Sequence, residues 1–249
     1  MALLTVETGS PTLRMTTTVN IISPVDAGTG SGGILYLLHG AGDNASTWHR
    51  LTTAELYASQ YGCTVIMPQM GRSYYTDMEY GLDYFRYITQ ELPEFCARLL
   101  NLESDPQKTF IAGLSMGGYG ALKCALTYPE RYSKVVSLSG VTDLQKRLND
   151  PHMAPEMSRE MMGVFGKGLQ VKPDQDIRVL ADKLVEDNRS LPPILTCCGS
   201  EDPFVEMNRE FAAYMETTPY DFRYVETPGS HEWRFWEQHL KTTFDFLYN

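Results

Sequence analysis

No uncharged apolar run in this 249-residue chain is long enough to cross a bilayer, and residues 1–10 lack the basic and apolar segments of a signal peptide. Basic residues are also scarce, because 21 Lys and Arg stand against 31 Asp and Glu and give a formal net charge of -10. A surface of that charge repels phosphate backbones, which disfavours a nucleic acid partner. These absences predict a soluble, cytoplasmic protein without a membrane or nucleic acid partner.

Cysteine is scarce too, and its odd number in apolar segments indicates reduced core thiols instead of a disulfide framework. The five cysteines are Cys63, Cys96, Cys124, Cys197 and Cys198. No His, Cys or carboxylate cluster has metal-ligand spacing, so we expect neither a metal nor a cofactor. Gly28, Gly30 and Gly33 fit G-x-G-x-x-G, but they precede a strand and open no helix, which excludes a dinucleotide site.

Short apolar runs bounded by Gly and Pro alternate with longer helical patterns, which predicts a three-layer α/β sandwich around a mostly parallel sheet. The predicted buried strands are 34–38, 64–67, 109–112, 135–139, 194–197 and 222–226, and a more polar segment at 16–22 predicts an antiparallel edge. The predicted helices are 54–60, 84–100, 116–127, 204–216 and 232–247, with a kink or a new helix start at Pro93. A hydrophobic content of 43% suits a single domain spanning 1–249.

The β-α rhythm lapses between residues 141 and 191, which predicts a small cap-like insertion over the active end of the sheet. The segment carries four methionines, Met153, Met157, Met161 and Met162. Unbranched Met side chains suit an adaptable acyl pocket and ordinary core packing equally well, so both interpretations stay open.

The run 110–120 contains G-x-S-x-G between a predicted strand and a predicted helix, which is the context of a nucleophile elbow. The sharp turn crowds the serine backbone, and Gly113 and Gly117 supply the clearance that it needs. Ser115 then projects above the sheet near the positive end of the following helix, where a developing oxyanion is favoured. The pattern predicts an α/β-hydrolase fold with Ser115 as its nucleophile.

The chain order of such a fold is serine, then acid, then histidine. Of the histidines after Ser115, His239 falls inside the last predicted helix and His152 lies in the insertion. His231 lies in a loop between the last predicted strand and the last helix, where the general base is expected.

The acid is expected in a loop at the carboxyl end of a strand, because those loops share the edge of the sheet that holds the nucleophile. Asp202 follows a strand and a Gly-Ser turn and precedes a helix-starting proline, so we favour it. Glu201 and Asp143 remain the alternatives.

Two backbone N–H groups should stabilise the tetrahedral oxygen. We expect them on Met116, directly after the nucleophile, and on Ala41 in the glycine-containing loop at 39–42. His39 precedes the serine and ends a strand, so it is expected to shape that loop through a structural hydrogen bond.

The chain resembles the esterase D family in five segments, 36–40, 71–77, 91–93, 113–122 and 229–233. This family includes tributyrin, feruloyl and acetyl esterases, S-formylglutathione hydrolases and mycolyltransferases. The resemblance covers nearly the whole chain. It implies nucleophile Ser115, acid Asp202, base His231 and oxyanion amides on Ala41 and Met116, in agreement with the assignment from the residues. Since family members are often dimers or tetramers, the resemblance leaves a homo-oligomer open.

The expected reaction is hydrolysis of a small, short-acyl carboxylic ester. The alternatives are a feruloyl, cinnamoyl or acetyl-xylan esterase, an S-formylglutathione hydrolase, a more distant acyltransferase, or a binding module. Residues 41–44 read Ala-Gly-Asp-Asn where S-formylglutathione hydrolases carry a Thr-Cys pair, which disfavours that branch. The candidate substrate contacts are aromatic residues near the expected site: Tyr74, Tyr75 and Trp233, together with Trp48. A basic residue near the site, Arg72, could favour an acidic ester.

Overall fold

The structure is a computed structural model that describes residues 1–24, 32–102 and 105–249. Its strands are β1 (Ala2–Ser10), β2 (Met15–Ser23), β3 (Ile34–Leu38), β4 (Thr64–Pro68), β5 (Thr109–Leu114), β6 (Lys134–Leu138), β7 (Ile194–Gly199) and β8 (Phe222–Thr227). Gly28 and Gly30 of the glycine pattern lie outside the described residues, so that prediction stays a prediction.

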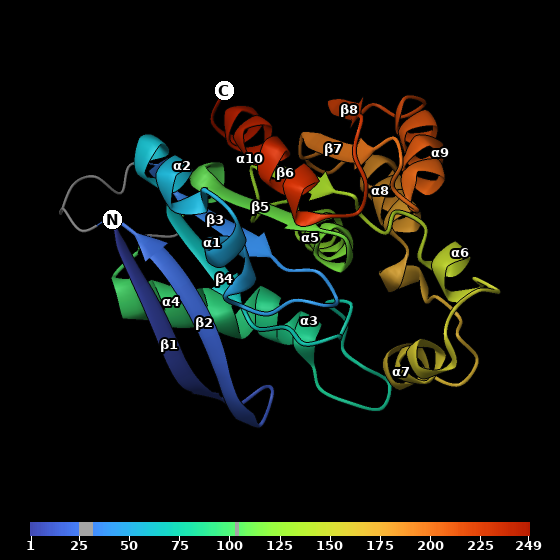
Figure 1. The fold of residues 1–249 in the computed structure, drawn as a ribbon, viewed down its shortest axis with the longest axis horizontal. Coiled ribbons are helices and arrows are strands. Elements are labelled where there is room, and N and C mark those ends of the chain that lie inside the picture. The colour runs from blue at the N-terminus through green and yellow to red at the C-terminus, as the bar shows by residue number, and fades with distance from the viewer. Residues whose placement is uncertain (25–31, 103–104) are drawn as a thin grey trace.

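Within the described residues the strands form one sheet in the order β1-β2-β4-β3-β5-β6-β7-β8 (Figure 1). All pairs from β4 to β8 are parallel, whereas β1–β2 and β2–β4 are antiparallel. The six predicted strands are present, and five of them are buried as predicted. Strand β8 has no buried residue, because it lies at the other edge of the sheet, so burial of 222–226 is wrong. The antiparallel direction of 16–22 is confirmed. Its position at the edge is wrong, because β1 pairs along the whole of β2 and takes the edge itself.

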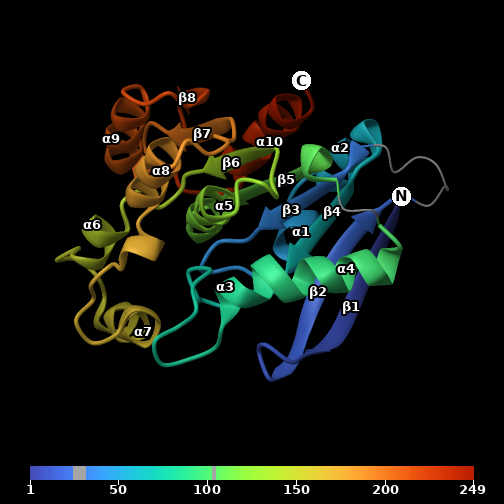
Figure 2. The ribbon, with the colours of Figure 1, turned by 180° about the vertical axis from the view of Figure 1, so that it is seen from behind.

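The helices are α1 (Thr47–Leu51), α2 (Ala54–Tyr61), α3 (Tyr84–Arg86), α4 (Leu92–Leu100), α5 (Met116–Thr127), α6 (Leu144–Leu148), α7 (Pro155–Phe165), α8 (Ile177–Glu186), α9 (Val205–Met215) and α10 (Trp233–Tyr248). Two buried apolar clusters separate them into layers. Helices α4, α5, α8 and α9 pack on one face of the sheet, and α1, α2 and α10 pack on the other (Figures 1 and 2). The predicted three-layer α/β sandwich is thereby confirmed.

The predicted helix at 84–100 is divided into three parts. After α3 a π-helical turn spans Tyr87–Glu91, and α4 then begins with Pro93 in its first turn. A proline is tolerated in the first turn of a helix because its fixed φ matches the helical backbone. Pro93 thus marks a new helix start, one of the two outcomes that the sequence predicted.

The segment between β6 and β7 is only partly an insertion. Helices α6 and α7 lie away from the sheet, whereas α8 packs against α5 in the helical layer (Figure 2). Helix α8 is amphipathic, and it buries Ile177, Ala181 and Leu184. The departure from the β-α rhythm therefore ends before Ile177, not at residue 191 as predicted.

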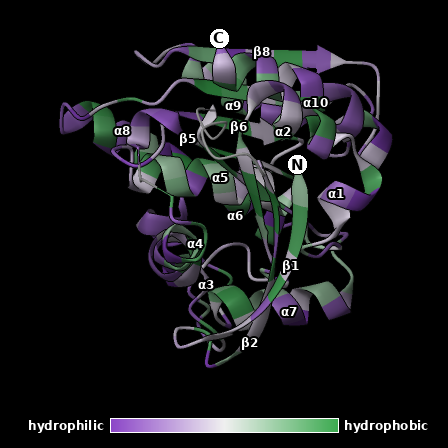
Figure 3. Cartoon of the chain, turned by 90° about the vertical axis from the view of Figure 1, so that its left-hand side faces the viewer, coloured by the Kyte–Doolittle hydropathy of each residue, from purple (hydrophilic) through white to green (hydrophobic). Residues whose placement is uncertain are grey.

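The central strands β3 to β7 are apolar, and helix α10 has one apolar and one polar side, as its hydropathy colouring shows (Figure 3). Helix α10 buries an apolar stripe that includes Phe235, Leu240 and Phe244. All five cysteines are buried and free. Among the helices that the structure describes, none combines the length and apolarity needed to cross a membrane.

Candidate active site

Ser115 occupies a strained turn directly between β5 and α5. Its backbone has φ 54° and ψ -117°, a conformation that L-residues rarely adopt. The turn needs glycine on both sides: a Cβ on Gly113 would lie 2.3 Å from the Gly117 oxygen, and one on Gly117 would lie 2.4 Å from the Leu38 oxygen. These contacts explain the G-x-S-x-G spacing in physical terms.

Three side chains from separate loops form one hydrogen-bonded chain. The Nε2 atom of His231 lies 3.0 Å from the Ser115 hydroxyl, and its Nδ1 atom lies 2.8 Å from Oδ2 of Asp202. The Asp202 side chain is fully buried, and its Oδ1 atom accepts a hydrogen bond of 2.8 Å from the Phe204 amide. An ionised carboxylate accepts only, so Nδ1–H donates to it and Nε2 is left to accept the serine proton.

The other candidates for acid and base lie elsewhere. Asp143 caps α6 through a 2.9 Å hydrogen bond from the Lys146 amide, and Glu201 is exposed. His152 lies exposed in a turn, whereas His239 is buried in α10, with Nε2 3.1 Å from the Thr227 hydroxyl.

The predicted oxyanion loop lies close to the nucleophile. A Cβ on Gly40 would lie 3.6 Å from Cβ of Ser115, which places the following Ala41 beside the serine. The Met116 amide belongs to the first residue of α5, so it has no intrahelical acceptor and adds to the positive end of that helix. Both predicted donors therefore belong to backbone adjacent to Ser115, and their role in binding the oxyanion stays a prediction.

His39 fixes the shape of this loop. Its Nε2 atom accepts a 3.0 Å hydrogen bond from the Met70 amide, so Nδ1 carries the proton and lies 2.7 Å from the Gly40 oxygen. Burial lowers the pKa of His39, which keeps the ring neutral. It makes the structural hydrogen bond that we expected at this position.

Two rings that the sequence analysis did not single out enclose His231. Phe204 and Trp236 meet it edge-on, with ring centroids 4.9 Å and 5.0 Å away. They restrict water around the imidazole and fix its plane. Phe204 directly follows the Asp-Pro pair that presents the acid. This proximity in sequence is the one signal from which its contact with His231 could have been predicted.

The three predicted aromatic substrate contacts differ in position. Tyr75 is wholly buried and donates a 2.9 Å hydrogen bond to the His39 carbonyl, so the predicted substrate contact is wrong for this residue. Tyr74 packs between Tyr119 and Phe165. Trp233 is partly exposed and packs on Trp236, one ring removed from His231.

Arg72 links the oxyanion loop to the insertion. Its Nη1 atom donates a 3.0 Å hydrogen bond to the Ala41 carbonyl, and its Nε atom lies 2.6 Å from Glu160 of α7. The guanidinium is therefore already paired with a carboxylate, which weakens its expected role in attracting an acidic ester.

Lys123, two turns along α5 from the nucleophile, is a buried cation that braces the segment next to this loop. Its ammonium donates to the Tyr75 carbonyl at 3.2 Å and to the Thr76 hydroxyl at 3.0 Å, and it lies 4.2 Å from the centre of the Phe85 ring. Burial lowers the pKa of Lys123 to about 8, against smaller raising effects of Cys124, Asp174 and Asp77.

Among the described residues no group of three or more His, Cys, Asp or Glu could hold a metal ion.

The lowered pKa of Lys123 predicts an unusual pH dependence of stability. Between pH 8 and about 10.4 the unfolded chain carries the proton and the folded chain does not, so the free energy of unfolding rises with pH. Relative to the Lys123→Met variant, the unmodified protein should gain about 2.5 kcal/mol between pH 7 and 10 in urea unfolding. A difference that stays constant with pH would show that Lys123 is protonated equally in both states.

This fold, with a serine on the elbow, defines an α/β-hydrolase of the serine hydrolase class. Residues 10–247 match the Esterase family model, which is described as "Putative esterase". The chain therefore belongs to this family, and it is a serine hydrolase that acts on carboxylic ester bonds.

Individual relatives agree with that membership. The chain is 28% identical over 263 residues to the acetyl esterase of Caldicellulosiruptor saccharolyticus, covering 99% of this chain and 98% of the relative. It superposes on FphF, a fluorophosphonate-binding serine hydrolase of Staphylococcus aureus, with a TM-score of 0.91 and 30% identity, covering 100% of this chain and 98% of FphF. The S-formylglutathione hydrolase FrmB of Staphylococcus aureus gives a TM-score of 0.87 and 30% identity, covering 100% of this chain and 99% of FrmB. The predicted esterase D resemblance is confirmed.

Proposed function

We propose that the protein hydrolyses short-acyl carboxylic esters through an acyl-enzyme on Ser115. One observation carries the proposal: the hydrogen-bonded chain from Ser115 through His231 to the buried Asp202. This arrangement of a nucleophile, a base and an orienting carboxylate is the one that serine hydrolases on unrelated folds share.

In the proposed reaction His231 takes the Ser115 proton as the hydroxyl oxygen attacks the ester carbonyl. The amides of Ala41 and Met116 donate to the oxygen of the tetrahedral intermediate. His231 then returns the proton to the leaving alkoxide, and a water molecule repeats the sequence to release the acid. Asp202 holds the imidazole in the reactive tautomer and stabilises the imidazolium that forms.

The acetyl esterase, a relative that matches over almost its whole length, supports the short-acyl assignment. FrmB supports S-formylglutathione as a second candidate, because that structure also matches over its whole length. The oxyanion loop favours the first, since residues 41–44 lack the Thr-Cys pair expected of S-formylglutathione hydrolases.

Turnover of p-nitrophenyl acetate, butyrate and octanoate, with S-formylglutathione and methyl ferulate, tests this specificity. We expect kcat/KM for acetate or butyrate to exceed that for octanoate and methyl ferulate by at least about tenfold, because each poorly accommodated methylene typically changes discrimination by about tenfold or more. A clear preference for S-formylglutathione would overturn the short-acyl assignment in favour of the second candidate. Product analysis with a competing alcohol should give mainly free acid, and mainly transferred ester would overturn hydrolysis.

A further inference from the structure

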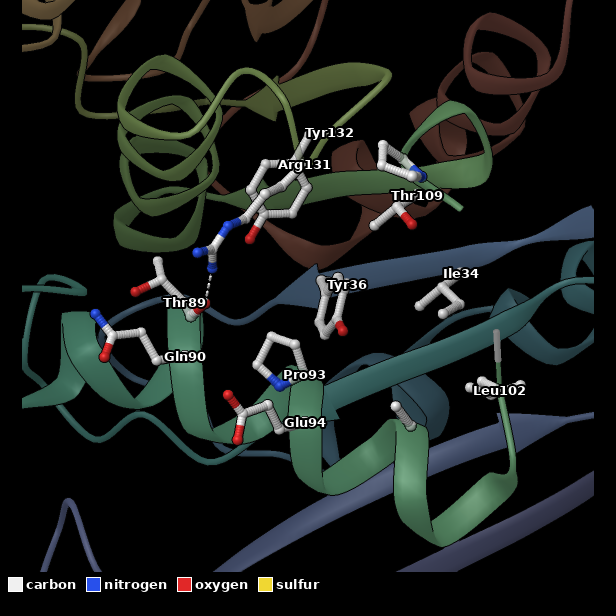
Figure 4. Close-up of a pocket in the computed structure, with 12 residues that line it drawn as sticks. Ile34, Tyr36, Thr89, Gln90, Pro93, Glu94, Leu102, Thr109, Arg131 and Tyr132 are labelled. Atoms are coloured by element: carbon white, nitrogen blue, oxygen red, sulfur yellow. Dashed lines mark hydrogen bonds between the residues drawn. The ribbon is translucent and has the colours of Figure 1, made fainter. Parts of the chain in front are cut away.

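A cavity of about 490 Å³ lies away from the serine, between α4 and the first residues of β3 and β5 (Figure 4). Ile34 and Thr109, the first residues of these strands, line it, whereas Ser115 directly follows the last residue of β5. Six residues of strand correspond to about 20 Å, so the cavity and the candidate active site lie at opposite ends of the sheet. Its volume is in the range of small-molecule sites.

The π-helical turn before α4 forms one wall and supplies an unusual acceptor. Pro93 has no N–H, so the carbonyl of Thr89, four residues earlier, lacks its usual helical donor. The Arg131 guanidinium donates to that carbonyl through Nη1, as Figure 4 shows. Arg131 is therefore held at the cavity wall by a neutral acceptor, and π-helical turns of this kind are frequent at functional sites.

The charge of Arg131 is only loosely balanced. The nearest carboxylate, Glu130, lies 4.0 Å from Nε of Arg131 but makes a closer contact of 2.8 Å with Arg189. Glu94, which also lines the cavity, lies 3.8 Å from Arg98 on α4 and is largely exposed. Among the described lining residues Arg131 is the cation and Glu94, on the α4 side, is the carboxylate, so the Arg131 wall is the part of the cavity that favours an anionic group.

Two phenols add hydrogen-bond donors to the same cavity. Tyr36 and Tyr132 are each 4% exposed, and their rings meet edge-on with centroids 6.4 Å apart. Both residues line the cavity, where a phenol can donate a hydrogen bond to a bound acceptor. Burial raises the pKa of both phenols, so both remain protonated and can donate.

We propose that this cavity is a second small-molecule site, which binds an amphipathic monocarboxylate through Arg131 and the hydroxyls of Tyr36 and Tyr132. The apolar body of the ligand packs on the α4 side, against Pro93 and Ala97. The guanidinium matches a carboxylate in charge and geometry, and the two phenols can donate hydrogen bonds to its oxygens.

Isothermal titration calorimetry with 3-phenylpropanoate at low ionic strength tests the proposal without any ester turnover, so its result is independent of the proposed reaction. We expect saturable binding that weakens about tenfold or more in Arg131→Met and in the Tyr36→Phe, Tyr132→Phe double variant. Ala97→Phe, which fills the cavity, should abolish binding. The neutral analogue 3-phenylpropan-1-ol should bind at least about tenfold more weakly than the carboxylate.

Tyr80→Phe provides the matched control, because Tyr80 is 63% exposed and does not line the cavity. Ser115→Ala should likewise bind the carboxylate unchanged. Thermal unfolding identifies any variant that fails to fold. If Arg131→Met fails to fold, Ala97→Phe and the Tyr36→Phe, Tyr132→Phe double variant still test the site, because neither removes the hydrogen bond from Arg131 to Thr89. Absence of saturable binding to the unmodified protein, binding that survives Ala97→Phe, or binding lost in Ser115→Ala would each overturn the proposal.

Discussion

Replacing His231 with alanine is expected to lower kcat for p-nitrophenyl acetate by about a millionfold, the magnitude typical of a lost base in a serine hydrolase. The reason is geometric: His231 Nε2 is 3.0 Å from the Ser115 hydroxyl. Without it the serine keeps its proton and is a weak nucleophile at neutral pH. Steady-state kinetics, with KM determined separately, gives the size of the loss.

His152→Ala is the matched control, since His152 is exposed in a turn and has no contact with the triad. Its kcat should remain within about twofold of the unmodified protein, as for surface substitutions in general. The double variant Ser115→Ala, His231→Ala should be scarcely slower than either single variant, because the two groups act as a unit. Additive losses would contradict a shared role.

Replacing Asp202 with asparagine should lower kcat by about 10⁴-fold with little change in structure. The amide is nearly the same size as the carboxylate, but it can present N–H to His231 Nδ1 and so stabilise the wrong tautomer. Nε2 would then carry the proton and could no longer accept one from Ser115. The loss should appear in kcat much more than in KM, because the interaction serves the transition state.

Two further substitutions separate Asp202 from the other acids near the sheet edge. Asp143→Asn should leave kcat nearly unchanged, because asparagine also caps a helix well and Asp143 caps α6. Glu201→Gln, at the exposed neighbour of Asp202, should also have little effect. A large loss in either variant, together with an active Asp202→Asn, would place the acid elsewhere.

The parts of the site nearest the elbow were predictable because local constraints combine there. The two glycines, a buried strand and an almost wholly buried helix fix the backbone around Ser115. Chain order and the position of parallel strand ends then pointed to His231 and Asp202, and the structure brings these three side chains within hydrogen-bond distance. Their catalytic roles remain predictions.

Features that depend on distant contacts were not predictable. Strand β1 alternates half-buried and exposed residues but carries Leu, Thr and Glu in a mixed pattern, and only its pairing with β2 defines it. Tyr75 follows a glycine-containing loop, as a substrate contact would, yet its ring fills the space above Gly120. The cavity beside α4 arises from four separate segments, and no local pattern identifies it.

Rapid acid quenching of a reaction with p-nitrophenyl acetate, followed by peptide mass spectrometry, tests the central claim most directly. The proposed mechanism predicts a burst of p-nitrophenol and an acetyl group on Ser115, both absent from Ser115→Ala. An acetyl group on a different residue, or full activity in Ser115→Ala, would contradict the assignment of Ser115 as the nucleophile.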